Sequence, residues 1–184
     1  MLNRLEIKNK EFFTKWSKKY DYGILKSFIR KLQDRALEEI SNTNNRLVLD
    51  IGCGTGELLL KLSKKYPKTK LFGVDLTKAM LFIAKKKLKA NFIETNANSL
   101  PFKNNHFDYI LSTEAFHHFS EPEKTLIEMK RVLKQNGKII IIDIYFGPVL
   151  SYIIHLIEQG NKWIYSKKDF QKIFNKTSLN LIKQ

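Results

Sequence analysis

The residues best suited to chemistry lie in one stretch, residues 48–56, which reads VLDIGCGTG. Strand-forming residues lead to the acid Asp50, and the chain then passes through three glycines at alternate positions: Gly52, Gly54 and Gly56. Glycine permits a tight turn and lets bare backbone approach a ligand, and the helix-forming residues that follow would point free N–H groups back into the turn. The stretch predicts a strand that delivers a cofactor to a helix, with an ordinary strand-to-helix connection as the alternative.

The spacing of these glycines narrows the choice of cofactor. A dinucleotide-binding fingerprint needs the pattern GxGxxG, but Gly56 comes one residue early and Glu57 occupies the third glycine position. A Walker loop would end in Gly-Lys-Ser or Gly-Lys-Thr, which is absent. Asp50, just before the glycines, would repel a pyrophosphate but can attract the ammonium group of an amino-acid-like ligand, directly or through water. S-adenosylmethionine fits that description.

A second acid, Asp75, ends the next expected strand, residues 71–75. It falls roughly 20 residues past the glycines, where a ribose-binding carboxylate belongs, and it can accept hydrogen bonds from both ribose hydroxyls. Asp75 could instead cap the following helix, although Thr77 is equally able to do so. Because the acid and the glycine turn support each other, the ribose role is favoured.

Strands and helices alternate along the chain, which predicts a Rossmann-like, doubly wound α/β fold: a mostly parallel sheet with helices on both faces. The expected strands are 47–51, 71–75, 91–94, 107–112 and 138–144, and the expected helices are 24–40, 57–66, 77–88 and 120–133. Ligands in such sheets bind at the carboxyl ends of strands. This pattern places four candidate segments there: residues 52–56, Asp75, Asn96 and Ser112.

Short sequence patterns also predict where individual helices, turns and strands begin and end. Residues 120–123 read Ser-Glu-Pro-Glu, a capping box with a proline in the first helical turn. The pair Asn136-Gly137 predicts a turn, and the four isoleucines 139–142 predict a fully buried strand. Farther along we expect a short apolar helix near 149–157, a helix capped by Ser166 and a last strand at 179–182.

Composition fits one domain over residues 1–184. With 184 residues and 43% hydrophobic content, the chain can bury a core. We expect an N-terminal segment 1–23, a cofactor-binding core 24–144 and a substrate-side part 145–184. The single cysteine excludes a disulfide framework and a cysteine zinc cluster, and no metal site is predicted. The cysteine count and the N-terminus without an apolar leader point to the cytoplasm. The apolar run 139–157 contains Asp143 and a Gly-Pro break, so no transmembrane segment is expected.

The chain carries a formal net charge of +15 and has a pI near 9.8. Such a surface would attract RNA or anionic lipid. Its lysines are scattered along nearly every segment, however, which favours a solvated lysine-rich surface over a binding face. The aromatic and basic stretch 10–22 could stack nucleic acid bases, or fold as a lid over a small-molecule pocket.

Together, these motifs resemble the class I S-adenosylmethionine-dependent methyltransferases, in particular the small-molecule subgroup that includes quinone-biosynthesis enzymes. The resemblance covers residues 13–144 and implies that Asp50 and the glycine turn, with Cys53, hold the methionine end of the cofactor. It also implies that Asp75 binds the ribose and that Leu76 lies beside the adenine. Four residues match the family's N-terminal lid segment, which favours the lid interpretation and brings Tyr20 to the cofactor: Phe13, Trp16, Tyr20 and Asp21.

Other segments match the family with departures. In TNANSLPF, residues 95–102, Asn96 stands where the family has an acid that binds the adenine amino group. Its amide oxygen can still accept that bond, and Ala97 follows it. The stretch FDYILSTEAFHHF places Ser112 by the methionine moiety. After residues 179–184 no residues remain for the seventh strand of the family's C-terminal hairpin, which is therefore expected to be incomplete in this sequence. Either the chain is trimmed there, or strand six lies unpartnered beside strand five, or another copy in a homo-oligomer covers the sheet edge.

The resemblance implies an enzyme, a methyltransferase that leaves S-adenosylhomocysteine as product. The sulfonium of S-adenosylmethionine already makes its methyl group electrophilic, so the protein mainly holds a nucleophile in line behind that carbon. A base is needed only where the nucleophile must lose a proton, and His117, His118 and Glu114 are the candidates. For the histidines, packing or capping at the start of a helix is the alternative.

The sequence also narrows the methyl acceptor. It lacks the Asn/Asp-Pro-Pro-Tyr motif of amino-group methyltransferases and the second cysteine that methylation of pyrimidine carbon five would need. We therefore expect a small or lipid-like acceptor. Two alternatives stay open: an RNA methyltransferase, suggested by the net charge, and a cofactor-binding subunit without transfer activity of its own, suggested by the incomplete hairpin.

Overall fold

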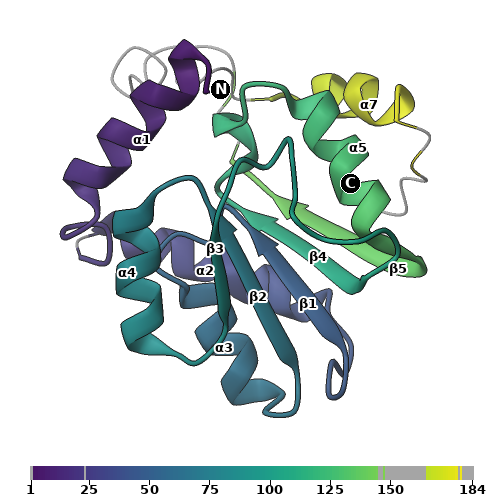
Figure 1. Ribbon diagram of the computed structural model, residues 1–184, viewed down its shortest axis with the longest axis horizontal. Coiled ribbons are helices and arrows are strands. Elements are labelled where there is room, and N and C mark those ends of the chain that lie inside the picture. Colours follow the sequence, from purple (N-terminus) through teal and green to yellow (C-terminus); the bar gives the residue numbers. More distant parts are fainter. Residues whose placement is uncertain (1, 23, 145–146, 148–164, 178, 180–184) are drawn as a thin grey trace.

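A computed structural model describes residues 2–22, 24–144, 147, 165–177 and 179. Within these residues the centre of the fold is a five-stranded sheet of order β3-β2-β1-β4-β5 in which every pairing is parallel (Figure 1). The strands are β1 Leu47–Ile51, β2 Lys70–Asp75, β3 Asn91–Glu94, β4 Phe107–Thr113 and β5 Leu133–Ile142. The parallel α/β sheet expected from the alternating pattern is confirmed.

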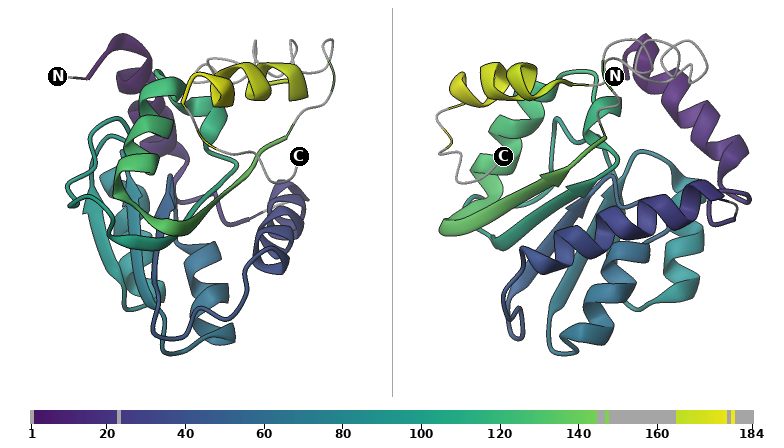
Figure 2. Two further views of the ribbon diagram at one scale, coloured as in Figure 1. Left: turned by 90° about the vertical axis from the view of Figure 1, so that its right-hand side faces the viewer. Right: turned by 180° about the vertical axis from the view of Figure 1, so that it is seen from behind.

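Helices cover both faces of this sheet, as expected for a doubly wound fold (Figures 1 and 2). Buried side chains of α2, α3 and α4 pack on one face, and those of α5 and α7 pack on the other. The helices are α1 Arg4–Trp16, α2 Ile24–Glu38, α3 Glu57–Lys65, α4 Lys78–Lys87, α5 Pro122–Val132 and α7 Lys167–Asn175, with a short 3₁₀ turn, η1, at Phe116–His118.

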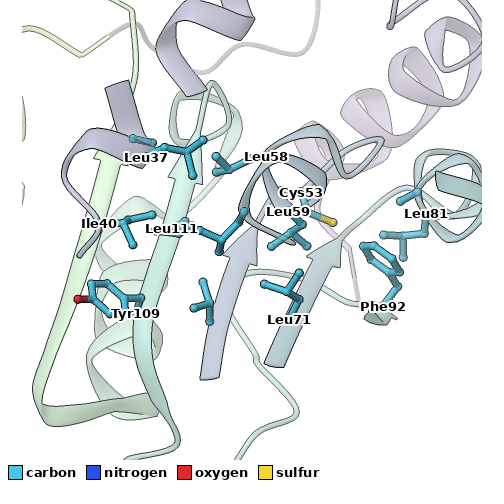
Figure 3. Close-up of a cluster of buried hydrophobic side chains, with 14 residues drawn as sticks. Leu37, Ile40, Cys53, Leu58, Leu59, Leu71, Leu81, Phe92, Tyr109 and Leu111 are labelled. Carbon is cyan, nitrogen blue, oxygen red and sulfur yellow. The ribbon is translucent and has the colours of Figure 1, made fainter. Parts of the chain in front are cut away.

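The two faces of the central strands feed two separate cores, because side chains alternate across a strand. Val48 packs into the core under α2, α3 and α4, which Figure 3 shows, whereas its neighbour Leu49 packs into the core under α5 and α7. Both side chains are completely buried. Burial on both faces explains why β1 and β4 read as nearly continuous apolar runs.

Strand β5 differs from the expectation at both its start and its burial. It begins at Leu133, and the predicted turn at Asn136-Gly137 is wrong: both residues lie within the strand. The pairing with β4 shifts between Phe107 and Tyr109, so an irregularity in β5 absorbs the extra residues. A Cβ at Gly137 would lie 3.0 Å from the carbonyl oxygen of Asp108, so this glycine serves close backbone approach.

The isoleucines 139–142 are partly buried, so the prediction of a fully buried strand is also wrong. The physical reason is position in the sheet. Among the described residues, β5 pairs only with β4 and forms an edge of the sheet.

The capping box predicted at Ser120 is wrong, although the helix itself is present. Helix α5 has Glu121 as its N-cap, with no side-chain capping bond, and Pro122 in its first turn. The hydroxyl of Ser120 instead donates to Oε1 of Glu6 at 2.6 Å. A tertiary hydrogen bond has replaced the local one.

Three expected elements fall in the C-terminal part of the chain. The helix capped by Ser166 is confirmed as α7, in which the Ser166 hydroxyl accepts a hydrogen bond from the N–H of Asp169. The helix expected near 149–157 and the strand expected at 179–182 lie outside the described residues, apart from Leu179. In the part of the chain that the structure describes, no helix has the length and apolar character needed to cross a membrane.

Candidate functional site

The glycine turn between β1 and α3 adopts a backbone conformation that side chains rarely allow. The φ angles of Gly52, Gly54 and Gly56 are +72°, +51° and +77°. A Cβ on Gly52 would also lie 2.4 Å from the Cβ of Ala115, a distance that no real pair tolerates. The N–H groups of Gly52 and Cys53 donate to the carbonyl of Val74 at 2.9 and 3.1 Å, which fixes the turn against the end of β2. Glycine is therefore required here by both conformation and space.

Asp75, the last residue of β2, ties the glycine turn to the next helix. Its Oδ2 accepts from the N–H of Gly54 at 2.9 Å, and its Oδ1 accepts from the N–H of Thr77 at 2.8 Å. Thr77 is the N-cap residue of α4 but makes no side-chain capping bond. Burial raises the pKa of Asp75, against the lowering effect of these hydrogen bonds. Asp75 is thus a buried acid held beside the bare backbone of the turn.

Asp50 lies one strand away and is 2% exposed. Its Oδ1 atom is buried, and no residue that the structure describes hydrogen-bonds it. Burial, and then the charge of Asp75, raise the pKa of Asp50 to about 8. A buried acceptor without a donor is costly for a folded protein, so its presence beside the glycine turn indicates a ligand that carries a donor or a positive charge.

A cavity of about 50 Å³ lies at the carboxyl ends of β1, β2 and β3, under helix α1. Pockets that hold drug-sized ligands usually measure about 300–1,000 Å³, so this cavity is narrow. Three elements supply its wall: the strand ends, the loop around η1 and one face of α1. The lining residues are Glu6, Asn9, Ile51, Gly52, Val74, Asp75, Leu76, Thr95, Asn96, Ala97, His118, Phe119 and Ser120.

Helix α1 was not foreseen as a helix, although its start carries a recognisable signal. The side chain of Asn3 accepts from the N–H groups of Leu5 and Glu6, and the Glu6 carboxylate accepts from the N–H of Asn3 at 2.8 Å. Asparagine followed three residues later by glutamate is a capping-box pattern. It would have predicted the helix that brings Glu6 and Asn9 to the cavity.

The segment after α1 packs on the glycine turn. A Cβ on Gly54 would lie 3.9 Å from the ring of Tyr20. Burial, followed by the charges of Asp75, Glu114, Asp21 and Asp50, raises the pKa of the Tyr20 hydroxyl. Asp21 accepts from the Thr55 hydroxyl at 2.8 Å, and Lys87 forms ion pairs with both Asp21 and Glu57. Two of the matched N-terminal residues, Tyr20 and Asp21, therefore lie against the turn.

Comparisons with known proteins agree with this geometry. Residues 49–141, half of the chain, match the family described as "Methyltransferase domain". The demethylmenaquinone methyltransferase of Thermotoga maritima is 35% identical over 132 residues, which cover 67% of this chain and 58% of that protein. The demethylmenaquinone methyltransferase of Thermus thermophilus is 32% identical over 155 residues, 74% and 68% of the two chains. The crystal structure of YcgJ from Bacillus subtilis aligns with a TM-score of 0.71 at 30% identity, covering 82% of this chain and 68% of that one.

The chain belongs to the S-adenosylmethionine-dependent methyltransferases. It spans less than two thirds of the length of the Thermotoga relative, 58%. The family's cofactor suits the residues present. The buried Oδ1 of Asp50 lacks a donor, and the glycine turn presents backbone where a Cβ would fill the space. The Ser112 hydroxyl is likewise buried without a partner, and burial raises the pKa of the Cys53 thiol, which makes it a packing residue rather than a nucleophile.

The adenine-side candidates of this methyltransferase lie together in the cavity wall. Leu76, Asn96 and Ala97 line it beside Asp75. The amide oxygen of Asn96 already accepts from the N–H of Asn98 at 3.0 Å, so one of its two lone pairs is used within the loop. The Asn96 side chain also hydrogen-bonds the Glu6 carboxylate.

The three candidate bases of the methyltransferase occupy different surroundings. His118 lines the cavity and packs edge-on against Phe13, with ring centroids 4.9 Å apart. His117 is buried, and its Nδ1 lies 2.5 Å from Oδ1 of Asp143. Glu114 does not line the cavity. Its φ is +52°, a backbone conformation that is strained for a residue other than glycine. The geometry therefore brings only His118 of the three to the cavity.

Sequence reasoning missed three polar residues at this site. Glu6 and Asn9 line the cavity from α1, and Asp143 holds His117. Asp143 interrupts an apolar run, which is the one local signal that it carries. Among the described residues no cluster of histidine, cysteine, aspartate or glutamate could hold a metal ion.

Proposed function

We propose that this protein transfers the methyl group of S-adenosylmethionine to a small, quinone-like acceptor. The observation that carries the proposal is the pairing of a glycine turn in strained backbone conformation with the unpartnered buried acceptor of Asp50. Relatives named demethylmenaquinone methyltransferases support the choice of a reduced quinone ring as the acceptor class. Within the expected class of small or lipid-like acceptors, we therefore propose a quinone-like molecule.

The proposed cofactor site uses the strand ends in order. Asp50 takes the ammonium group, the turn from Gly52 to Gly56 follows the methionine chain, and Asp75 takes the ribose hydroxyls. Leu76 and Ala97 give the adenine two apolar contacts, with Asn96 at its polar edge. Ser112 and Tyr20 complete the methionine side of the site.

The proposed chemistry is an in-line displacement. S-adenosylmethionine supplies an electrophilic methyl group when bound. A ring carbon of the reduced quinone forms the new carbon–carbon bond while the carbon–sulfur bond breaks and its electron pair stays on sulfur. The ring proton must then leave, and His118 accepts it, because this histidine lines the cavity. The chain's further task is to hold the two reactants aligned, which can contribute about 7–11 kcal/mol.

Titration calorimetry with S-adenosylmethionine and S-adenosylhomocysteine tests the cofactor claim, and both ligands should bind. Transfer of labelled methyl to a reduced, short-chain demethylnaphthoquinone tests the acceptor class. His118→Gln should lower kcat by about 10²–10⁴-fold with little change in cofactor affinity. Glu11→Gln on the exposed side of α1 is the matched control. Cofactor binding without transfer to any quinol would leave the role of a non-catalytic subunit.

The RNA methyltransferase alternative rests on the net charge of +15. RNA binding that falls steeply between 50 and 200 mM salt would favour it, and no measurable affinity for RNA at low salt would remove it. We also propose a cytoplasmic protein, in keeping with its free, buried Cys53, and self-association through the β5 edge. Sedimentation of the protein over a range of concentrations tests the last point.

A further inference from the structure

The buried residues of helix α1 are polar, which is unusual for a helix that packs on a protein. Its two buried residues are Glu6 and Asn9, which are 5% and 6% exposed, whereas the apolar Ile7 of the same helix is 46% exposed. Helices normally bury an apolar stripe, because burying polar groups costs free energy unless they find partners. The first turns of α1 are therefore positioned by hydrogen bonds, while Phe13 farther along the helix packs on His118. The polar residues can offer hydrogen bonds to a ligand that enters beneath them.

Both residues are fixed in orientation by long-range contacts. The Nδ2 of Asn9 donates to the carbonyl oxygen of His118 at 2.9 Å, 109 positions away. The Glu6 carboxylate accepts from the Ser120 hydroxyl at 2.6 Å. Burial opposes the charge on Glu6, but hydrogen bonds from Ser120, Asn96 and the Asn3 N–H outweigh it and lower the pKa of this carboxyl. Glu6 is thus a carboxylate at neutral pH.

The anchored amide of Asn9 leaves an acceptor without a donor. Because a carbonyl oxygen can only accept, the atom that bonds His118 must be the amide nitrogen, which fixes the amide oxygen on the other side. That Oδ1 atom is buried and has no hydrogen-bond partner among the described residues. Asn9 and Glu6 both line the cavity, so α1 brings a charged acceptor and an unsatisfied neutral acceptor to the same wall.

The position of the Glu6 and Asn9 acceptors indicates which N–H group of the cofactor they could bind. S-adenosylmethionine carries N–H groups at two ends, the ammonium of its methionine part and the exocyclic amino group of adenine. Asp50 stands at the glycine turn and serves the first. Asp50 itself does not line the cavity, whereas both α1 acceptors line it together with Leu76, Asn96 and Ala97, and Glu6 hydrogen-bonds Asn96. Asn96 has already committed one lone pair to the N–H of Asn98.

We propose that Glu6 and Asn9 of α1 bind the adenine amino group and make this methyltransferase selective for adenine over purines that lack it. The inference rests on the proposed function, because it assumes that the cofactor lies in this cavity. The cavity measures only about 50 Å³, so its wall must open for the cofactor to enter. In the proposal α1 makes this movement, and the Glu6 carboxylate, which now contacts Ser120 and Asn96, then meets the ligand.

The test compares two ligands by calorimetry: S-adenosylhomocysteine and its 6-deamino analogue, in which hydrogen replaces the amino group. The wild-type protein should prefer the natural ligand by about 10- to 100-fold, since the analogue lacks the donor that the buried acceptors of Glu6 and Asn9 would bind. In Glu6→Ala this ratio should fall to a few-fold, and in Asn9→Leu it should fall by a smaller factor. Glu11→Gln, on the exposed side of the same helix, should keep the wild-type ratio.

The ratio of the two affinities distinguishes recognition of the amino group by α1 from a purely structural role of this helix. If α1 only covers the site, Glu6→Ala weakens both ligands equally and the ratio stays at its wild-type value, which would overturn the proposal. Asp50→Asn is the reciprocal control, because it should weaken both ligands without changing the ratio. Failure of the wild-type protein to bind S-adenosylhomocysteine at all would overturn the proposed function together with this inference. Binding with an unaltered ratio in the α1 variants would overturn this inference alone.

Discussion

The two walls of the cavity are built in different ways. The wall of strand ends is held by bonds between residues close in sequence, such as that from the Gly54 N–H to Asp75, 21 positions apart. The α1 wall is held by side chains that reach across 109 and 114 positions, from Asn9 to His118 and from Ser120 to Glu6. The first wall is part of the sheet, and the second is attached to it by polar contacts and by the packing of Phe13 on His118. We expect the strand wall to set affinity and the α1 wall to set access and selectivity.

The largest effect should come from the strand wall, with Gly52→Ala. The alanine would have to hold a φ of +72°, which costs about 1–2 kcal/mol, and its Cβ would lie 2.4 Å from that of Ala115. We expect loss of measurable S-adenosylhomocysteine binding and a lower urea midpoint. Gly147→Ala is the matched control, because Gly147 has a φ of +81° but no atom of the described residues lies within 4 Å of the added Cβ. Equal effects of the two substitutions would show that conformation, not space, is what matters.

A smaller but still large effect is expected for Asp75→Ala. The variant loses the acceptor for two backbone N–H groups, those of Gly54 and Thr77, and in our proposal it also loses the ribose contact. Titration calorimetry should show S-adenosylhomocysteine affinity lower by about 10- to 100-fold. A variant that keeps full affinity would limit Asp75 to its structural bonds.

Asp50 gives the strand wall a pH dependence. Its pKa, raised to about 8, keeps the carboxyl mostly protonated at pH 6–7 in the absence of cofactor. An ammonium group favours the carboxylate, so binding releases a proton, and affinity should rise by up to about tenfold per pH unit from pH 6 to 7. Calorimetry in buffers of different ionisation enthalpy measures the released proton. Asp50→Asn should bind more weakly and with no such rise, and a rise of unchanged size would assign the proton to another group.

The smallest effect should come from the α1 wall, with Ser120→Ala. The variant loses the 2.6 Å bond to Glu6, a change of about 1 kcal/mol. Because that bond attaches α1 and not the sheet, hydrogen exchange should quicken in α1 while the overall melting temperature stays nearly constant. Thr125→Val, which removes a hydroxyl of α5 that donates to Asn98, is the control. Faster exchange throughout the sheet would contradict the separation of the two walls.

The contrast also explains what could be predicted from the sequence. The strand wall could be predicted, because the glycine turn and Asp75 belong to short sequence patterns that determine the local backbone structure. The capping box predicted at Ser120 is wrong because the Ser120 hydroxyl donates to Glu6, 114 positions away, instead of capping its own helix. The pair of His117 and Asp143 forms only because β4 and β5 run side by side. The start of α1, in contrast, was visible in Asn3 and Glu6.

The cluster of acids around Tyr20 has a consequence for turnover. Asp50, Asp75, Asp21 and Glu114 all act on that hydroxyl, within a protein whose net charge is +15. Charges beyond about 8 Å are largely screened at physiological salt, so the local acids dominate what a ligand experiences inside. The methyl donor is a sulfonium cation, and its demethylated product is a neutral sulfide. In the proposed reaction, methyl transfer therefore removes the sulfonium charge but leaves the ammonium group, so this acidic hollow favours the methyl donor over the product by one charge only.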